Sequence, residues 1–171
     1  VAGTGTVAVN GTFVQIAGST LTGMTAVNTA FNSGSVYEVQ NTTFGTLPTA
    51  TWDTASTILV TGLNAATSAA ASWAQNIGNL TIACPNLGAA AANLAGRPTI
   101  NGNLTISNTG ASGRVVLFSG AGTSTINITG SLTVSGSAVM YAGTSGTVTV
   151  NVSGGVVFNT SGAVSRLTQT G

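Results

Sequence analysis

Very few side chains in this sequence could carry acid–base chemistry. The 171 residues include two carboxylates, Glu38 and Asp53, together with three arginines and no lysine or histidine. A glycosidase needs two carboxyl groups about 5 to 9.5 Å apart. Glu38 and Asp53 are separated by less than one repeat of the chain, so we expect them on different walls unless the turn at residues 45–51 folds one over the other. We interpret them as solvated or turn-capping acids.

The composition also argues against metal, cofactor and nucleophile chemistry. Without histidine there is no imidazole base or imidazole ligand, and a calcium site would need several carboxylates. The glycine-rich stretch 110–122 leads from strand to strand, whereas a phosphate-binding loop leads from a strand into a helix. The single cysteine, Cys84, follows the apolar residues Leu80 and Ile82, which predicts a buried, inert thiol. We therefore predict a protein that is not an enzyme and has no cofactor or metal.

Charge and hydropathy exclude further classes. The formal net charge is +1, and the chain lacks the clustered basic residues that bind nucleic acid or anionic lipid. Hydrophobic residues make up 43% of the chain, which does not fit a disordered protein. No apolar run reaches the roughly 18 residues that a membrane-spanning helix needs. We expect a folded protein that neither binds nucleic acid nor inserts into a membrane.

A repeated phrase between Ile100 and Phe158 indicates how the chain is organised. Each copy is a glycine followed by a short strand in which apolar residues alternate with threonine or serine. The glycines Gly78, Gly102, Gly130 and Gly154 are separated by steps of 24, 28 and 24 residues. Strand repeats at such a period, without helices between them, are typical of solenoids. We predict one all-β domain over residues 1–171: a single-stranded, right-handed parallel β-helix (β-solenoid) of about seven coils.

The alternation within each strand predicts which side chains point inward. Leucine and isoleucine or valine should form buried columns, and the threonine between them should form an outward ladder. At the corners, glycine is expected to supply positive φ, and asparagine to bond the turn backbone or its counterpart in the next coil. The expected turn residues are Gly78, Asn79, Gly102, Asn103, Gly130 and Gly154.

Two alanine-rich stretches depart from this pattern. Residues 63–76 are expected to form an irregular insertion with one helical turn at most, packed across one face by Trp73. Residues 89–94 are a weaker candidate for the same kind of excursion.

Several segments carry a resemblance to a known class of proteins. The runs Leu47–Asp53, Ile77–Asn86 and Asn101–Ile106 resemble the repetitive, low-charge regions of large Bacteroidota cell-surface proteins, which are adhesin-like substrates of type IX secretion. The resemblance implies an extracellular or cell-surface location and a β-helical stalk that is part of a longer chain. It also implies an O-glycosylation motif, which Asp53-Thr54-Ala55 matches, so Thr54 is a candidate for modification.

These observations lead to ranked hypotheses for function. The first is an extracellular structural or adhesive segment, such as a stalk, surface filament or adhesin. The second is a carbohydrate-binding module whose ligand stacks on Trp52, Trp73 or Tyr141. The third is an ice-binding surface built from the threonine ladder, and a polysaccharide-processing enzyme comes last. Expected partners are glycans or surfaces, and a second rod or a flanking coil joined end to end through unpaired strand edges.

Overall fold

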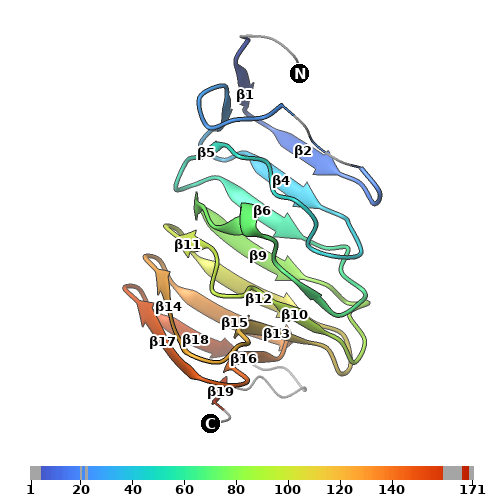
Figure 1. Ribbon diagram of the computed structural model, residues 1–171, viewed down its shortest axis with the longest axis vertical. Helices are drawn as coiled ribbons and strands as arrows, with labels where there is room; N and C mark the ends of the chain where they lie inside the picture. The colour runs from blue at the N-terminus through green and yellow to red at the C-terminus, as the bar shows by residue number, and fades with distance from the viewer. Residues whose placement is uncertain (1–4, 20, 22, 160–166, 170–171) are drawn as a thin grey trace.

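The computed structural model describes residues 5–19, 21, 23–159 and, for the backbone, 167–169. Over these residues the chain winds into a parallel β-solenoid of about six turns (Figure 1). The fold predicted from the repeats is therefore confirmed. The described residues form one continuous stack of coils, in which each strand pairs in parallel with its counterparts in the neighbouring coils.

Seven strands stack into the longest sheet, which we call the long wall. Seven strands on one side correspond to about six full turns of the chain. The long wall contains β2 (Thr12–Gln15), β4 (Val36–Val39), β6 (Thr57–Val60), β9 (Asn79–Ala83), β12 (Leu104–Asn108), β15 (Leu132–Ser137) and β18 (Val156–Asn159).

Three shorter sheets complete the solenoid. The five-stranded groove wall contains β7 (Thr67–Ser68), β10 (Ala91–Asn93), β13 (Arg114–Phe118), β16 (Met140–Gly143) and β19 (Leu167–Gln169). The four-stranded threonine wall contains β8 (Asn76–Ile77), β11 (Thr99–Ile100), β14 (Thr123–Ile128) and β17 (Thr147–Val152). A three-stranded N-terminal sheet contains β1 (Val7–Val9), β3 (Thr29–Phe31) and β5 (Thr51–Trp52).

The register of the long wall produces the predicted columns. Leu80, Leu104 and Leu132 are Cα partners in successive coils, and all three are buried. The isoleucine and valine residues two positions later form a second buried column. The intervening Thr81, Thr105 and Thr133 also lie in register and are only half-buried. Burial of aliphatic columns, at roughly 25 cal/mol per Å² of apolar surface, is the main source of stability in such a stack.

The recurring corner glycines have a different role from the one predicted. Gly78, Gly102, Gly130 and Gly154 do not have positive φ; that conformation occurs at other turns, such as Gly34 with φ of 76°. Instead, these glycines lie directly on top of one another. The amide of Gly102 donates to the carbonyl of Gly78 at 3.1 Å, and the amide of Gly130 donates to the carbonyl of Gly102 at 2.9 Å.

Close approach between coils explains why glycine is required at these corners. A Cβ atom at Gly102 would collide with the side-chain oxygen of Asn79, and one at Gly130 would collide with that of Asn103. Because Gly102 and Gly130 have no side chain, the side chains of Asn79 and Asn103 can extend across the corner to the next coil along the chain. The glycine and the asparagine that follows it therefore work together as a stacking unit.

The two alanine-rich stretches each contribute a short strand to the solenoid. Within residues 63–76, Thr67–Ser68 forms strand β7 and pairs with Ala92–Asn93 of β10. The single helical turn expected there is present as a 3₁₀ turn, η1 (Ala71–Trp73). The second stretch supplies β10 itself. Strands β7 and β10 are only two and three residues long and contain small or polar residues. They therefore lack the alternation of large apolar and polar residues by which a strand is recognised in a sequence.

Aromatic rings fill the core of the N-terminal coils. Phe31 and Trp52 stack with their ring centroids 4.2 Å apart, and the ring of Tyr37 meets both of them edge-on. The hydroxyl of Tyr37 donates to Oε1 of Gln15 at 2.6 Å, and both residues are buried. This hydrogen bond satisfies the polar ends of two side chains inside the core.

Candidate functional site

The two carboxylates are engaged separately and each has its own polar partners. Glu38 lies on β4 of the long wall, where Oε1 accepts hydrogen bonds from Nε2 of Gln40 at 2.9 Å and from Oγ1 of Thr61 at 3.0 Å. Asp53 follows β5, and its Oδ1 accepts the backbone amide of Ala55 at 2.8 Å. The turn-capping role predicted for Asp53 is confirmed. The structure does not join the two acids in a shared hydrogen-bond network.

Cys84 is fully buried, as predicted. Its thiol donates to the carbonyl of Val60 at 3.3 Å. Burial removes water from around the sulfur and thereby raises the pKa of the Cys84 thiol, which keeps it protonated at neutral pH. In the part of the chain that the structure describes, no group of three or more His, Cys, Asp or Glu side chains is arranged to hold a metal ion.

Two of the three aromatic residues predicted to stack on a ligand are in the core. Trp73 has no exposed surface, and its ring packs edge-on against Phe44. Trp52 is 7% exposed, and one face of its ring is covered by Phe31. Trp52 ends the two-residue strand β5 and Trp73 ends the 3₁₀ turn η1, and in such short elements burial could not be recognised from the sequence. The ligand-stacking role assigned to Trp52 and Trp73 is therefore corrected: both are core residues. Only Tyr141, on β16 of the groove wall, remains partly exposed.

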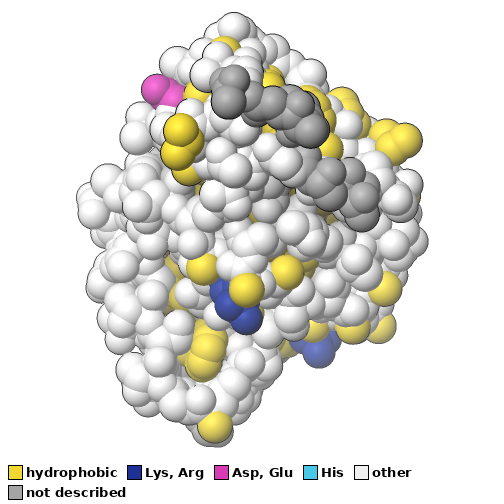
Figure 2. Space-filling model, turned by 45° about the horizontal axis from the view of Figure 1, so that its top comes forward, with side chains coloured by type: hydrophobic (Ala, Val, Ile, Leu, Met, Phe, Trp, Pro, Cys, Tyr) yellow, Lys and Arg dark blue, Asp and Glu magenta, His cyan; other side chains and the backbone are white. Residues whose placement is uncertain are grey.

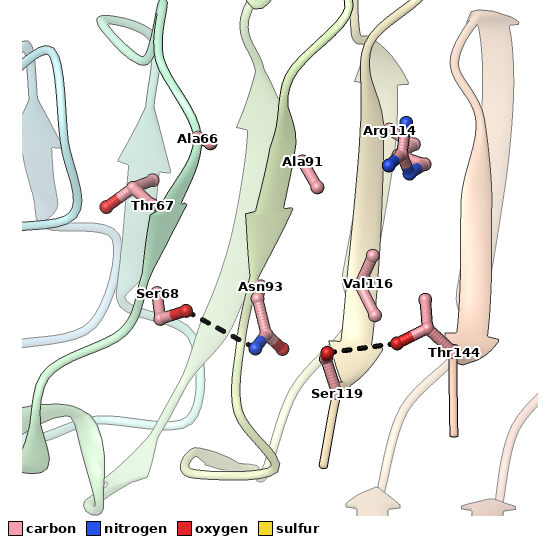
Figure 3. Close-up of a pocket in the computed structure, with 9 residues that line it drawn as sticks. All are labelled: Ala66, Thr67, Ser68, Ala91, Asn93, Arg114, Val116, Ser119 and Thr144. Carbon is pink, nitrogen blue, oxygen red and sulfur yellow. Dashed lines mark hydrogen bonds between the residues drawn. The ribbon is translucent and has the colours of Figure 1, made fainter.

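A shallow groove of about 530 Å³ runs across the groove wall. Figure 3 shows its lining side chains, which come from β7 and the residue before it, from β10 and β13, and from the turns that follow β13 and β16. The groove therefore crosses the strands and runs along the rod. The lining residues are Ala66, Thr67, Ser68, Ala91, Asn93, Arg114, Val116, Ser119 and Thr144.

Hydroxyl and amide groups form one edge of this groove. Nδ2 of Asn93 donates to Oγ of Ser68 at 3.3 Å, and Oγ1 of Thr144 donates to Oγ of Ser119 at 2.9 Å (Figure 3). Ser68 and Asn93 are Cα partners in adjacent strands, so their side chains extend side by side from the wall. The groove thus offers a row of uncharged polar groups.

Arg114 supplies the only positive charge among the lining residues. It is the Cα partner of Ala91 in β10, and this small neighbour leaves the wall hollow beside the guanidinium. The guanidinium carbon lies 5.7 Å from the centroid of the Tyr141 ring, close enough for a cation–π contact. Nε of Arg114 is buried and has no hydrogen-bond partner among the described residues.

A second polar surface lies on the threonine wall. Strands β14 and β17 pair over six consecutive positions, which brings Thr123 beside Thr147 and Thr125 beside Thr149. All four threonines are exposed. Asn127 and Asn151 continue the array, and Nδ2 of Asn151 donates to Oδ1 of Asn127 at 2.9 Å. These two asparagines are Cα partners in adjacent coils.

Charged side chains are sparse on the surface. Figure 2 shows one face of the molecule, on which the few acidic and basic side chains stand apart among uncharged polar groups and scattered apolar ones. Arg97 is exposed, and its Nε donates to the carbonyl of Ala69 at 2.9 Å. Arg166 lies outside the described residues. Thr54 is exposed in the turn between β5 and β6, where its modification stays a prediction.

Sequence reasoning missed Arg114 and its groove. A signal was present, because one arginine begins the apolar strand Arg114–Phe118 in a chain with only 3% charged residues. Its partners across the groove are distant in the sequence.

No protein-family model, curated protein or solved structure matches this chain. Over the described residues, no helix is long and apolar enough to cross a membrane. The site is therefore interpreted from its own geometry.

Proposed function

We propose that this chain is a structural and adhesive β-solenoid segment of an extracellular or cell-surface protein, and that it acts by binding rather than by catalysis. The observation that carries the proposal is the register of its outward side chains. Thr81, Thr105 and Thr133 align on the long wall, and two rows of threonine align on the threonine wall. Such walls offer many weak, uncharged hydrogen-bonding contacts over a long surface.

The placement of the acids supports the non-catalytic part of the proposal. Acid catalysis of glycoside cleavage needs a pair of carboxyl groups arranged around one bond. Glu38 bonds Gln40 and Thr61 on the long wall, and Asp53 caps its own turn. Each acid thus forms hydrogen bonds within its own part of the fold, and the two do not form a pair around a common site.

The location and the export route rest on the resemblance to Bacteroidota surface repeats. A low-charge rod with a single buried thiol suits an oxidising exterior, because it exposes no cysteine to oxidation. The proposal includes a place in a longer protein secreted by the type IX route.

Association at the rod end is also part of the proposal. Val156 and Phe158 continue the two buried columns of the long wall, yet they are 51% and 41% exposed in β18. Another apolar coil placed against them would extend the columns. A flanking coil of a longer chain or a second copy would supply that surface, and sedimentation over a range of concentrations would detect the second copy.

An adhesion assay combined with a turnover assay tests the main proposal. The chain is applied to immobilised polysaccharides and mineral surfaces, and the supernatant is analysed for released sugars. We expect retention on at least one surface without product release, and unchanged retention for the double variant Glu38→Gln/Asp53→Asn. Release of sugar fragments by the wild-type chain that stops in the double variant would contradict the proposal.

Ice binding is a second candidate, favoured by the array on the threonine wall. Threonines at alternate positions of two paired strands form an aligned array of four side chains, each with a hydroxyl and a methyl group. Thermal hysteresis measured at high protein concentration tests this function. Thr125→Lys should abolish any hysteresis, while Thr133→Lys on the long wall should preserve it. No hysteresis in the wild-type chain would remove the candidate.

A further inference from the structure

We propose that the groove beside Arg114 binds an anionic sugar unit, carrying a carboxylate or a sulfate ester, within a polyhydroxylated chain. The inference rests on the proposed function, because it names the kind of ligand that an adhesive wall would hold. Its site is the groove between Ala91, Asn93 and Arg114.

The guanidinium of Arg114 suits an anionic ligand. Arginine is charged at all physiological pH values and presents its donors in a planar fork that matches oxyanions. Nε of Arg114 is buried and lacks a hydrogen-bond partner among the described residues. A buried donor without a partner is rare in folded proteins and calls for an explanation. Nε itself is closed off from the groove. An anionic ligand would therefore be held by the other guanidinium nitrogens, and its negative charge would offset part of the cost of the unpartnered donor.

The surroundings of Arg114 leave its charge unpaired by the two acids of the chain. The ring of Tyr141 lies 5.7 Å from the guanidinium carbon and limits where the fork can point. Asp53 is engaged in its own turn, and Glu38 is bonded to neighbours on a different wall. Both carboxylates hydrogen-bond other residues, so the positive charge of Arg114 is available to an external anion.

The size and length of the groove suit an extended ligand. About 530 Å³ of space extends along the rod, within the roughly 300–1,000 Å³ typical of ligand sites. Strands spaced about 4.8 Å apart carry the lining from β7 to the turn after β16, a length of roughly 14 Å. That length suits a chain of sugars better than a single small ion.

The polar edge of the groove complements sugar hydroxyls. Oγ of Ser68 accepts a bond from Asn93, and a serine hydroxyl that accepts one bond can still donate another. The methyl groups of Ala66 and Ala91 leave room for a sugar ring beside Arg114. A neutral sugar would leave the positive charge of Arg114 without a counter-charge, so charge should dominate selectivity.

The three arginines of the chain make a direct test feasible. Side-chain Nε–H signals are recorded by NMR while three oligosaccharides are titrated: an oligogalacturonate, a sulfated dextran oligomer and a neutral cello-oligomer. We expect one of the two anionic oligomers to shift a single arginine signal, which Arg114→Lys identifies by its absence. Which oligomer shifts it distinguishes a carboxylate from a sulfate ligand.

Variants then test the site by affinity. Arg114→Gln should weaken binding of the anionic oligomer at least about tenfold, as expected for loss of charged hydrogen bonds. Ala91→Leu, which fills the groove without changing the charge, should weaken it to a similar degree. Arg97→Gln is the matched control and should bind within about twofold of wild type. Circular dichroism melting curves check that all the variants fold.

The outcomes separate this inference from the proposed function. Equal binding of the neutral oligomer, or wild-type affinity in folded Arg114→Gln, would overturn the inference. If the chain adheres to surfaces but no oligomer shifts an arginine signal, the inference fails and the proposed function stands. If the chain degrades the oligomers, the proposed function fails.

Discussion

Oδ1 of Asn79 accepts two hydrogen bonds from Asn103 in the next coil, one from the backbone amide at 2.9 Å and one from Nδ2 at 3.2 Å. Oδ1 of Asn103 in turn accepts the amide of Ser131 at 2.8 Å. Each asparagine side chain thus accepts a hydrogen bond from a backbone amide in the next coil along the chain. The corner of the solenoid is held by a ladder of amides rather than by salt bridges or by a metal.

Removal of one asparagine of this ladder should destabilise the fold. Asn103→Ala deletes the acceptor for the Ser131 amide and the donor to Asn79, so we expect a loss of about 1–2 kcal/mol in the free energy of unfolding. Asn86→Ala, at an exposed turn, is the control and should change it by less than about 0.5 kcal/mol. Denaturant titration measures both. Equal effects would show that the ladder contributes no special stability.

The corner glycines should tolerate no side chain. Gly102→Ala places a Cβ atom against the Asn79 side-chain oxygen. The Asn79 side chain must then leave its hydrogen bonds to Asn103, and the added Cβ also lies 2.9 Å from the carbonyl oxygen of Thr54, so we expect destabilisation of about 2 kcal/mol or more. Gly11→Ala is the matched control, because no atom lies within 4 Å of its added Cβ. Thermal melting compares the two variants, and a Gly102→Ala variant as stable as Gly11→Ala would refute the close-approach explanation.

Trp73 should behave as a core residue. Trp73→Ala removes a fully buried indole that packs against Phe44 and donates from Nε1 to the carbonyl of Gly45 at 3.2 Å. We expect a loss of about 3–5 kcal/mol in stability. Trp73→Phe keeps part of the packing and should lose less. Should Trp73→Ala leave the unfolding midpoint unchanged while impairing glycan binding, the assignment to the core would be wrong.

Stability should be insensitive to pH near neutrality and should fall in alkali. Burial raises the pKa of Cys84 and of Tyr37 above their usual values, so the native state keeps protons that the unfolded state releases. For groups with a raised native pKa, the stabilisation is complete below the unfolded pKa and is lost as the pH rises above it. The decline should therefore begin near pH 8.5, the ordinary value for cysteine, and steepen above about pH 10, where tyrosine ionises.

Melting curves from pH 6 to 11 measure this profile. Tyr37→Phe removes the contribution of the tyrosine, so its stability should decline less steeply above about pH 10 than that of the wild-type chain. A wild-type melting temperature that rises between pH 8 and 10 would contradict the sign of both shifts.

The sequence by itself determined the winding and the inside of the rod. A strand phrase that recurs every 24 to 28 residues cannot bury its apolar face alone, so it predicted stacked parallel coils. The alternation in Leu104-Thr105-Ile106 assigned leucine and isoleucine to the core and threonine to the surface. Both signals are local, because the direction of a side chain in a strand depends only on its position within the strand.

The tertiary structure decided what lies between distant coils. Glycine is required at the corners because an asparagine side chain of the neighbouring coil occupies the space of a Cβ atom. This contact is visible only once the coils are stacked in their register. Trp73 reached the core through a short turn with no periodic signal. Ser68, Asn93 and Arg114 meet in one groove only because successive coils stack, which brings residues more than twenty positions apart in the chain to adjacent strands. A single strand contains no information about its neighbours in the stack, so this site became visible only in three dimensions.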